Sequence, residues 1–123
     1  MADIHGITSL IPLIPCRTST TTQTGTGVDI TDFDGGIKFI LDAAAGTGTT
    51  PTNDVKIQDS ADNSAWADVS GLTFTQLTTS ASLQSIGFPA NSLRKYIRAV
   101  ATIAGTTPSY TFSVNAVGSK QVI

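Results

Sequence analysis

The longest alternation of apolar and polar residues lies near the end of the chain. From Tyr110 to Ala116 every second residue is apolar and the residues between are polar, which is the two-residue period of a strand with one buried face. The run from Ile97 to Ile103 offers a matching apolar face, and residues 104–109 between the two runs are rich in turn formers. We therefore predict a long antiparallel hairpin onto which shorter strands pack.

Shorter apolar runs separated by turn residues fill the chain from residue 25 onward. They are centred on segments 28–30, 37–42, 55–57, 72–76 and 83–88. With the hairpin they give about seven or eight strands with a turn every ten or so residues, a spacing typical of sandwich folds. The predicted fold class is all-β: an antiparallel β-sandwich, jelly-roll-like or immunoglobulin-like, with an extended N-terminal arm.

One short turn sequence occurs twice. Residues 46–51 read Gly-Thr-Gly-Thr-Thr-Pro, and residues 105–108 read Gly-Thr-Thr-Pro. Two copies are too few for a repeat architecture. We interpret them as two connections with the same steric task, the first within a long loop predicted over residues 43–53.

Residues 1–24 form the predicted arm, and residues 25–123 form the predicted β-sandwich domain. Pro12 and Pro15 remove backbone donors from the arm and favour extended conformations before them. Such a segment either folds back as an edge strand of its own sheet or adds to a neighbouring chain, and the sequence leaves both open. Its apolar residues are candidate protein–protein contacts: Ile4, Ile7, Leu10, Ile11, Leu13 and Ile14.

Charge narrows the choice of partner. The chain carries nine acidic residues, all Asp, against seven Lys and Arg, for a net charge of −2. We expect neither nucleic acid nor a membrane as partner, because both require a basic surface or a long apolar span. A single cysteine, Cys16, permits no disulfide within the chain.

No pattern of reactive residues points to catalysis. His5 and Cys16 are the only residues of their types, and both lie in the arm, where nothing holds them as a nucleophile pair. One His and one Cys also cannot supply the usual ligands of a metal ion. We expect no enzyme activity, no catalytic residue, no metal and no cofactor.

A cluster of oxygen-bearing residues lies between positions 59 and 68. Asp59, Asp62, Asn63 and Asp68 lack the spacing of a calcium loop and its closing Glu. Turn formation by Asp and Asn explains them without a metal.

Trp66 and Tyr96 are candidate surface aromatics. They offer a stacking platform for a sugar, but a structural Trp that closes the hairpin onto the core is the more common arrangement. Arg98 is predicted to pair with a strand Asp or to contact a neighbouring subunit.

Three segments carry a resemblance to a known group of proteins. The segment 54–69, the run Lys95-Tyr-Ile-Arg-Ala-Val100 and the sequence Gly105-Thr-Thr-Pro108 resemble small structural proteins of tailed bacteriophages over residues 25–117. Gly27-Val-Asp-Ile30, Asp34 and the strand at Ile37 also fit. The arm departs from the pattern.

Within this group the chain is most similar to capsid decoration, or cement, proteins. The resemblance implies a non-enzymatic virion protein, made in the host cytoplasm, that binds the exterior of the major capsid protein shell. It also implies self-association, with a trimer expected by analogy. The alternatives are a phage tail structural protein and a sandwich on the virion that binds glycan or host surface.

Overall fold

The computed structural model describes residues 7–120 and confirms the all-β prediction. Every strand pair is antiparallel, and the short 3₁₀ helix η1 (Ala90–Ser92) is the only helical turn in the described part. The strands are β1 (Ile7–Ser19), β2 (Gln23–Thr24), β3 (Val28–Asp29), β4 (Phe33–Ala43), β5 (Thr47–Ser60), β6 (Ala67–Thr73), β7 (Ser82–Pro89) and β8 (Tyr96–Lys120).

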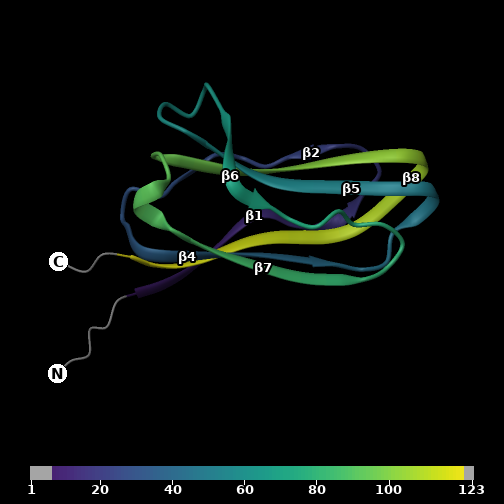
Figure 1. The fold of residues 1–123 in the computed structure, drawn as a ribbon, viewed down its shortest axis with the longest axis horizontal. Helices are drawn as coiled ribbons and strands as arrows, with labels where there is room; N and C mark the ends of the chain where they lie inside the picture. The colour runs from purple at the N-terminus through teal and green to yellow at the C-terminus, as the bar shows by residue number, and fades with distance from the viewer. Residues whose placement is uncertain (1–6, 121–123) are drawn as a thin grey trace.

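β8 is a single strand of 25 residues, so the predicted hairpin between residues 97 and 116 was wrong. Its first half pairs with β5, from Tyr96 opposite Ser60 to Ser109 opposite Thr47. Its second half pairs with β4, ending with Lys120 opposite Phe33. Figure 1 shows β5 and β8 side by side, both bending at the same end of the molecule.

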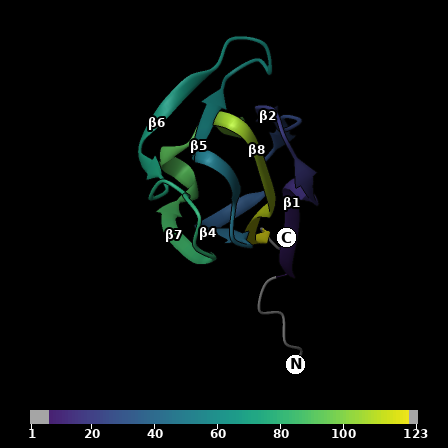
Figure 2. The ribbon, with the colours of Figure 1, turned by 90° about the vertical axis from the view of Figure 1, so that its right-hand side faces the viewer.

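The bend folds this long ribbon into two layers (Figure 2). Sheet A contains β7, β4, the second half of β8 and β1, in that order. Sheet B contains β6, β5 and the first half of β8, with the short strands β2 and β3 on its far edge. The two layers form the antiparallel β-sandwich that the sequence predicted.

The two Gly-Thr-Thr-Pro sequences form the bend. Gly48 and Gly105 both have φ of 121°, and Thr50 and Thr107 both have φ of 47°. A positive φ suits glycine and costs other residues free energy. Both copies therefore have the same backbone conformation, which differs from that of a regular strand. The long loop predicted over residues 43–53 is therefore mostly strand: β5 begins at Thr47.

β1 belongs to the sandwich of its own chain. It pairs with the second half of β8, from Ile7 opposite Lys120 to Ser19 opposite Tyr110. Leu13 and Ile14 are 2% and 1% exposed and join the core. Of the two possibilities left open by the sequence, the structure places this segment as an edge strand.

The core lies between the two sheets and includes the inward residues of every long strand. β8 contributes from both halves, because it crosses the bend and faces inward on either side of it. The members with the largest fully buried side chains include Tyr110, Phe39, Phe112, Leu13, Ile57 and Ile97. The inward alternation read from residues 110–116 is thus confirmed, although its partner strands are β4 and β1 rather than residues 97–103.

Candidate interaction surfaces

The arm residues proposed as contacts have different environments. Leu13 and Ile14 are buried in the core, so in this conformation they contact their own chain and cannot face another. Ile11 is partly buried against the core. Leu10 is 66% exposed. Ile4 and His5 lie outside the described residues, and Ile7 starts β1 opposite Lys120.

Arg98 lies on the outer face of sheet B and holds Trp66. Its guanidinium carbon is 4.4 Å from the centroid of the Trp66 ring, a distance at which a cation is attracted to the ring face. Its Nε donates a hydrogen bond to Gln58 Oε1 at 2.9 Å. In the structure Arg98 therefore contacts an amide and an aromatic ring rather than the predicted strand Asp, and its alternative contact with a neighbouring subunit stays a prediction.

Trp66 also contacts Gly27. A methyl group at the Gly27 Cβ position would lie 2.9 Å from two carbons of the indole ring and would also overlap the Asn63 side chain. The ring therefore lies between the guanidinium of Arg98 and the backbone of Gly27, closing the turn of residues 60–66 onto sheet B. This contact matches the structural interpretation of Trp66. Tyr96 is partly buried, with the Lys95 ammonium 5.4 Å from its ring centroid.

The three carboxylates of the oxygen-rich cluster are bound to three different sets of protein groups. Asp59 is 8% exposed and accepts hydrogen bonds from the backbone N and the Nε of Arg94 at 3.1 and 2.9 Å. Asp68 pairs with Lys56 at 3.0 Å and accepts a bond from Gln58. Among the described residues no group of three or more His, Cys, Asp or Glu is arranged to hold a metal ion.

Asp62 shapes the turn before Trp66. One of its carboxylate oxygens accepts hydrogen bonds from the backbone N–H groups of Ser64 and Ala65, both at 2.9 Å. These donors favour the charged form and hold the pKa of Asp62 below its ordinary value. Hydrogen bonds from Gln58 and then Lys56 likewise lower the pKa of Asp68. The oxygen atoms of both residues are thus used within the fold.

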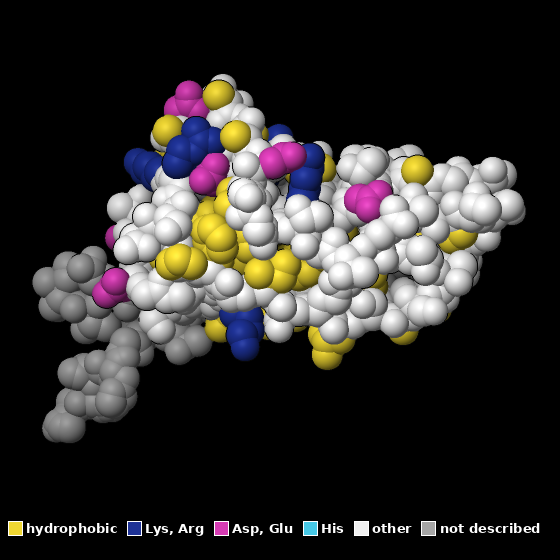
Figure 3. All heavy atoms as spheres, viewed as in Figure 1, with side chains coloured by type: hydrophobic (Ala, Val, Ile, Leu, Met, Phe, Trp, Pro, Cys, Tyr) yellow, Lys and Arg dark blue, Asp and Glu magenta, His cyan; other side chains and the backbone are white. Residues whose placement is uncertain are grey.

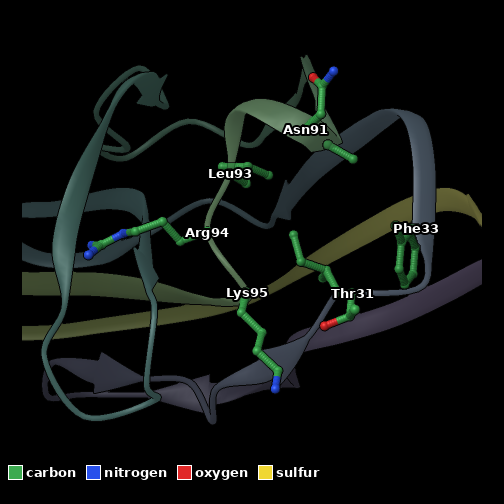
Figure 4. Close-up of a pocket in the computed structure, with 8 residues that line it drawn as sticks. Thr31, Phe33, Asn91, Leu93, Arg94 and Lys95 are labelled. Atoms are coloured by element: carbon green, nitrogen blue, oxygen red, sulfur yellow. The ribbon is translucent and has the colours of Figure 1, made fainter.

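A cleft of about 470 Å³ opens beside η1 (Figure 4). Its walls include the apolar residues Ile30, Ala90 and Leu93. Arg94 and Lys95 also line it, but Figure 4 shows both side chains pointing away from it, and Arg94 is engaged with Asp59. A ligand site needs a few convergent polar groups in addition to apolar walls, so we assign no ligand to this cleft.

The two sheets have contrasting outer faces. Sheet B displays the linked charged and polar side chains of Lys56, Gln58, Asp68 and Arg98. Sheet A displays serine, asparagine, glycine and apolar residues with few charges. Both of the large hydrophobic side chains that are exposed in the described residues lie on sheet A, Leu10 at 66% and Leu83 at 73%. An apolar surface of this kind often marks a protein contact, and Leu83 is not among the contacts predicted from the sequence.

The flank between β6 and β7 is the seam where the two sheets do not pair directly. Figure 3 shows apolar side chains gathered there, and Val69, Ile86 and Phe88 are the partly buried hydrophobics of these strands. The Gln84 side chain spans the seam, accepting a hydrogen bond from Thr75 N at 2.8 Å and donating one to Thr75 O at 3.0 Å. A side-chain amide thus replaces a strand pair at this edge.

Solved structures with a similar fold include two proteins whose names point to phages. XepA, a PBSX exported protein, is 13% identical with a TM-score of 0.59, covering 94% of this chain and 38% of XepA. YomS, an SPBc2 prophage-derived protein, is 10% identical with a TM-score of 0.54, covering 95% of this chain and 98% of YomS. A structure of infectious bursal disease virus, Gt strain, is 14% identical with a TM-score of 0.56, covering 94% of this chain and 33% of the viral chain.

These likenesses establish the fold. No family model matches the sequence, and no curated protein matches it. This chain spans little more than a third of XepA and nearly all of YomS. Within residues 7–120 no helix is long and apolar enough to cross a membrane.

Proposed function

We propose that this protein is a non-enzymatic structural protein of a tailed bacteriophage virion, and specifically a capsid decoration protein. It binds the outside of the shell that the major capsid protein forms, and its copies also contact one another. The fold likeness to XepA and YomS supports the phage origin, and the resemblance over residues 25–117 supports the role in decoration.

The observation that carries the proposal is how the polar side chains are used. Asp59, Asp62 and Asp68 bind groups of their own chain, while the exposed apolar residues Leu10 and Leu83 lie on a sheet face with few charges. Such a surface suits contact with other proteins, and a shell with many identical sites needs only a modest interface at each one.

The first experiment uses shells that lack this protein. Adding the purified protein is expected to restore co-sedimentation with the shell and resistance to heat or osmotic shock. Ile4→Asp is expected to weaken rebinding, because the start of the arm is a proposed contact and a buried unpaired charge is costly. Thr102→Asp, an exposed site on sheet B, is the matched control. Shells that gain neither protein nor resistance would refute cementing.

A tail structural protein with the same fold differs from a decoration protein only in its position on the particle. Labelling the protein on intact particles separates the two. Label on the head supports decoration, and label confined to the tail overturns it.

A further inference from the structure

We propose that the outer face of sheet A is a self-complementary interface, where two copies of this chain pack face to face about a two-fold axis at Ile40. The partner is thus a second copy of the chain. The inference deepens the proposed function, in which copies contact one another, and it needs no capsid to be tested.

The face is defined by strand pairing. Residues directly opposite each other in antiparallel strands point to the same side of the sheet. Starting from the outward residues of β4, the pairing gives three rows: Leu83, Asp42 and Ser113; Ser85, Ile40, Asn115 and Pro12; and Gly87, Lys38, Val117 and Leu10. Ile40 and Val117 are partly exposed, so the apolar surface extends from β7 to β1.

The first complementary feature is a protruding residue and a hollow. Leu83 is 73% exposed. Two rows away on the same strand, Gly87 has open space where a side chain would be. It lines a hollow of about 400 Å³ together with Gly36, Lys38 and Val117. The proposed two-fold axis lies in the plane of the interface and runs along the middle row. Rotation about it exchanges the two outer rows, which places Leu83 of each copy over the hollow of the other.

The second feature is charge. Lys38 and Asp42 lie on opposite sides of Ile40 along β4. They are about 13 Å apart along the strand and so cannot pair with each other. The ion pairs among the described side chains join Lys56 to Asp68 and Arg94 to Asp59, and neither involves Lys38 or Asp42. The same axis places Lys38 of one copy opposite Asp42 of the other, twice per dimer.

The size of the face sets the expected strength. Four strands about 4.8 Å apart and some six residues of strand length give roughly 400 Å² of flat area per copy. This is at the small end of specific interfaces, where complexes are weak and reversible. We therefore expect a monomer–dimer equilibrium with a Kd in the micromolar range, roughly 10–500 µM.

The test is sedimentation of the full chain from about 1 µM to about 1 mM, a range that spans the expected Kd. The wild-type protein is expected to shift from monomer to dimer. Lys38→Asp and Asp42→Lys alone are each expected to weaken association at least about tenfold, since each places like charges opposite each other. The double variant is expected to restore it. Lys95→Asp makes the same charge change outside sheet A and is the control.

A cross-link locates the axis. In a Cys16→Ser background, Ile40→Cys is expected to form a disulfide-linked dimer on mild oxidation, because residue 40 lies next to its own copy at the axis. Thr102→Cys, exposed on sheet B, is expected not to. A monomer throughout the concentration range, or a dimer that the charge exchange fails to restore, overturns the interface. Either result leaves the shell proposal standing.

Discussion

Gly48 and Gly105 occupy equivalent positions in the two strands that bend together, each opposite the threonines of the other Gly-Thr-Thr-Pro sequence. A Cβ on Gly48 would lie 2.7 Å from Thr107 O and 2.9 Å from Thr106 O, and a Cβ on Gly105 would lie 2.8 Å from Thr50 O and 3.2 Å from Thr49 O. Each glycine thus approaches the threonine carbonyls of the other Gly-Thr-Thr-Pro sequence. The two copies fold the β4–β5 and β8 segments over together, which produces the two layers.

Replacing either glycine should therefore destabilise the fold. Gly48→Ala or Gly105→Ala is expected to lower the unfolding free energy by about 1–3 kcal/mol, from both backbone strain and the contact with carbonyl oxygens. Urea denaturation measures it. Gly36→Ala is the control, because Gly36 has an ordinary φ and open space around it. Equal losses of unfolding free energy at positions 36 and 105 would contradict the close approach of Gly105 to the threonine carbonyl oxygens.

The Asp59–Arg94 pair anchors the segment after η1 to β5. Asp59→Ala is expected to cost about 1–3 kcal/mol, since it removes the buried carboxylate that accepts hydrogen bonds from the backbone N and the Nε of Arg94. Thermal unfolding followed by circular dichroism measures the loss. Asp32→Ala, at an exposed site, should change stability by no more than about 0.5 kcal/mol. A similar loss at both positions would show that the pair contributes nothing specific.

Low pH should reduce the free energy of unfolding. The pKa of Asp62 is held below its ordinary value of 3.8 by backbone N–H groups. The unfolded chain therefore takes up protons first as the pH falls, so the stabilisation is complete above 3.8 and is lost as the pH drops through the lowered pKa. Urea midpoints measured from about pH 7 to about pH 2 should decrease as the pH drops below the ordinary pKa of Asp62. Asp62→Asn should make this decrease of the urea midpoint smaller. An unchanged decrease would argue against a stabilising role for the Asp62 carboxylate.

Trp66 should act as a structural residue. Trp66→Ala is expected to reduce stability by about 1–3 kcal/mol, because it removes the contacts with Gly27 and Arg98. Urea unfolding of both proteins gives the difference. A sugar platform would behave differently: the variant would keep its stability, and glycans would perturb the fluorescence of Trp66 in the wild type.

Asn53 offers a route to a more stable protein. It is fully buried, and neither polar atom of its side-chain amide has a hydrogen-bond partner in the structure. Asn53→Leu is expected to raise the unfolding free energy by about 1 kcal/mol, because it removes two unpaired buried polar groups and keeps the branching of the side chain. The backbone pairing of Asn53 with Leu77 remains. A lower melting temperature than wild type would show that the amide is stabilising.

Some of the candidate site was readable from the sequence and some was not. Exposure of Leu10 was consistent with its position in an apolar arm, but Leu13 and Ile14 in the same run are buried. Leu83 carried no distinguishing signal, because an apolar residue in an alternating strand is ordinarily assigned to the core. Arg98 was identified, but its partners Gln58 and Trp66 lie far from it along the chain.

The sequence by itself determined the all-β class, the inward face of residues 110–116 and the special backbone at the two Gly-Thr-Thr-Pro sequences. These are local properties, set by the two-residue period of a strand and by the φ range that glycine permits. Only the tertiary structure decided that residues 104–109 bend one strand instead of reversing it, and that β1 lies on β8. The same turn residues suit a reversal or a bend, and the choice depends on the strand that pairs alongside.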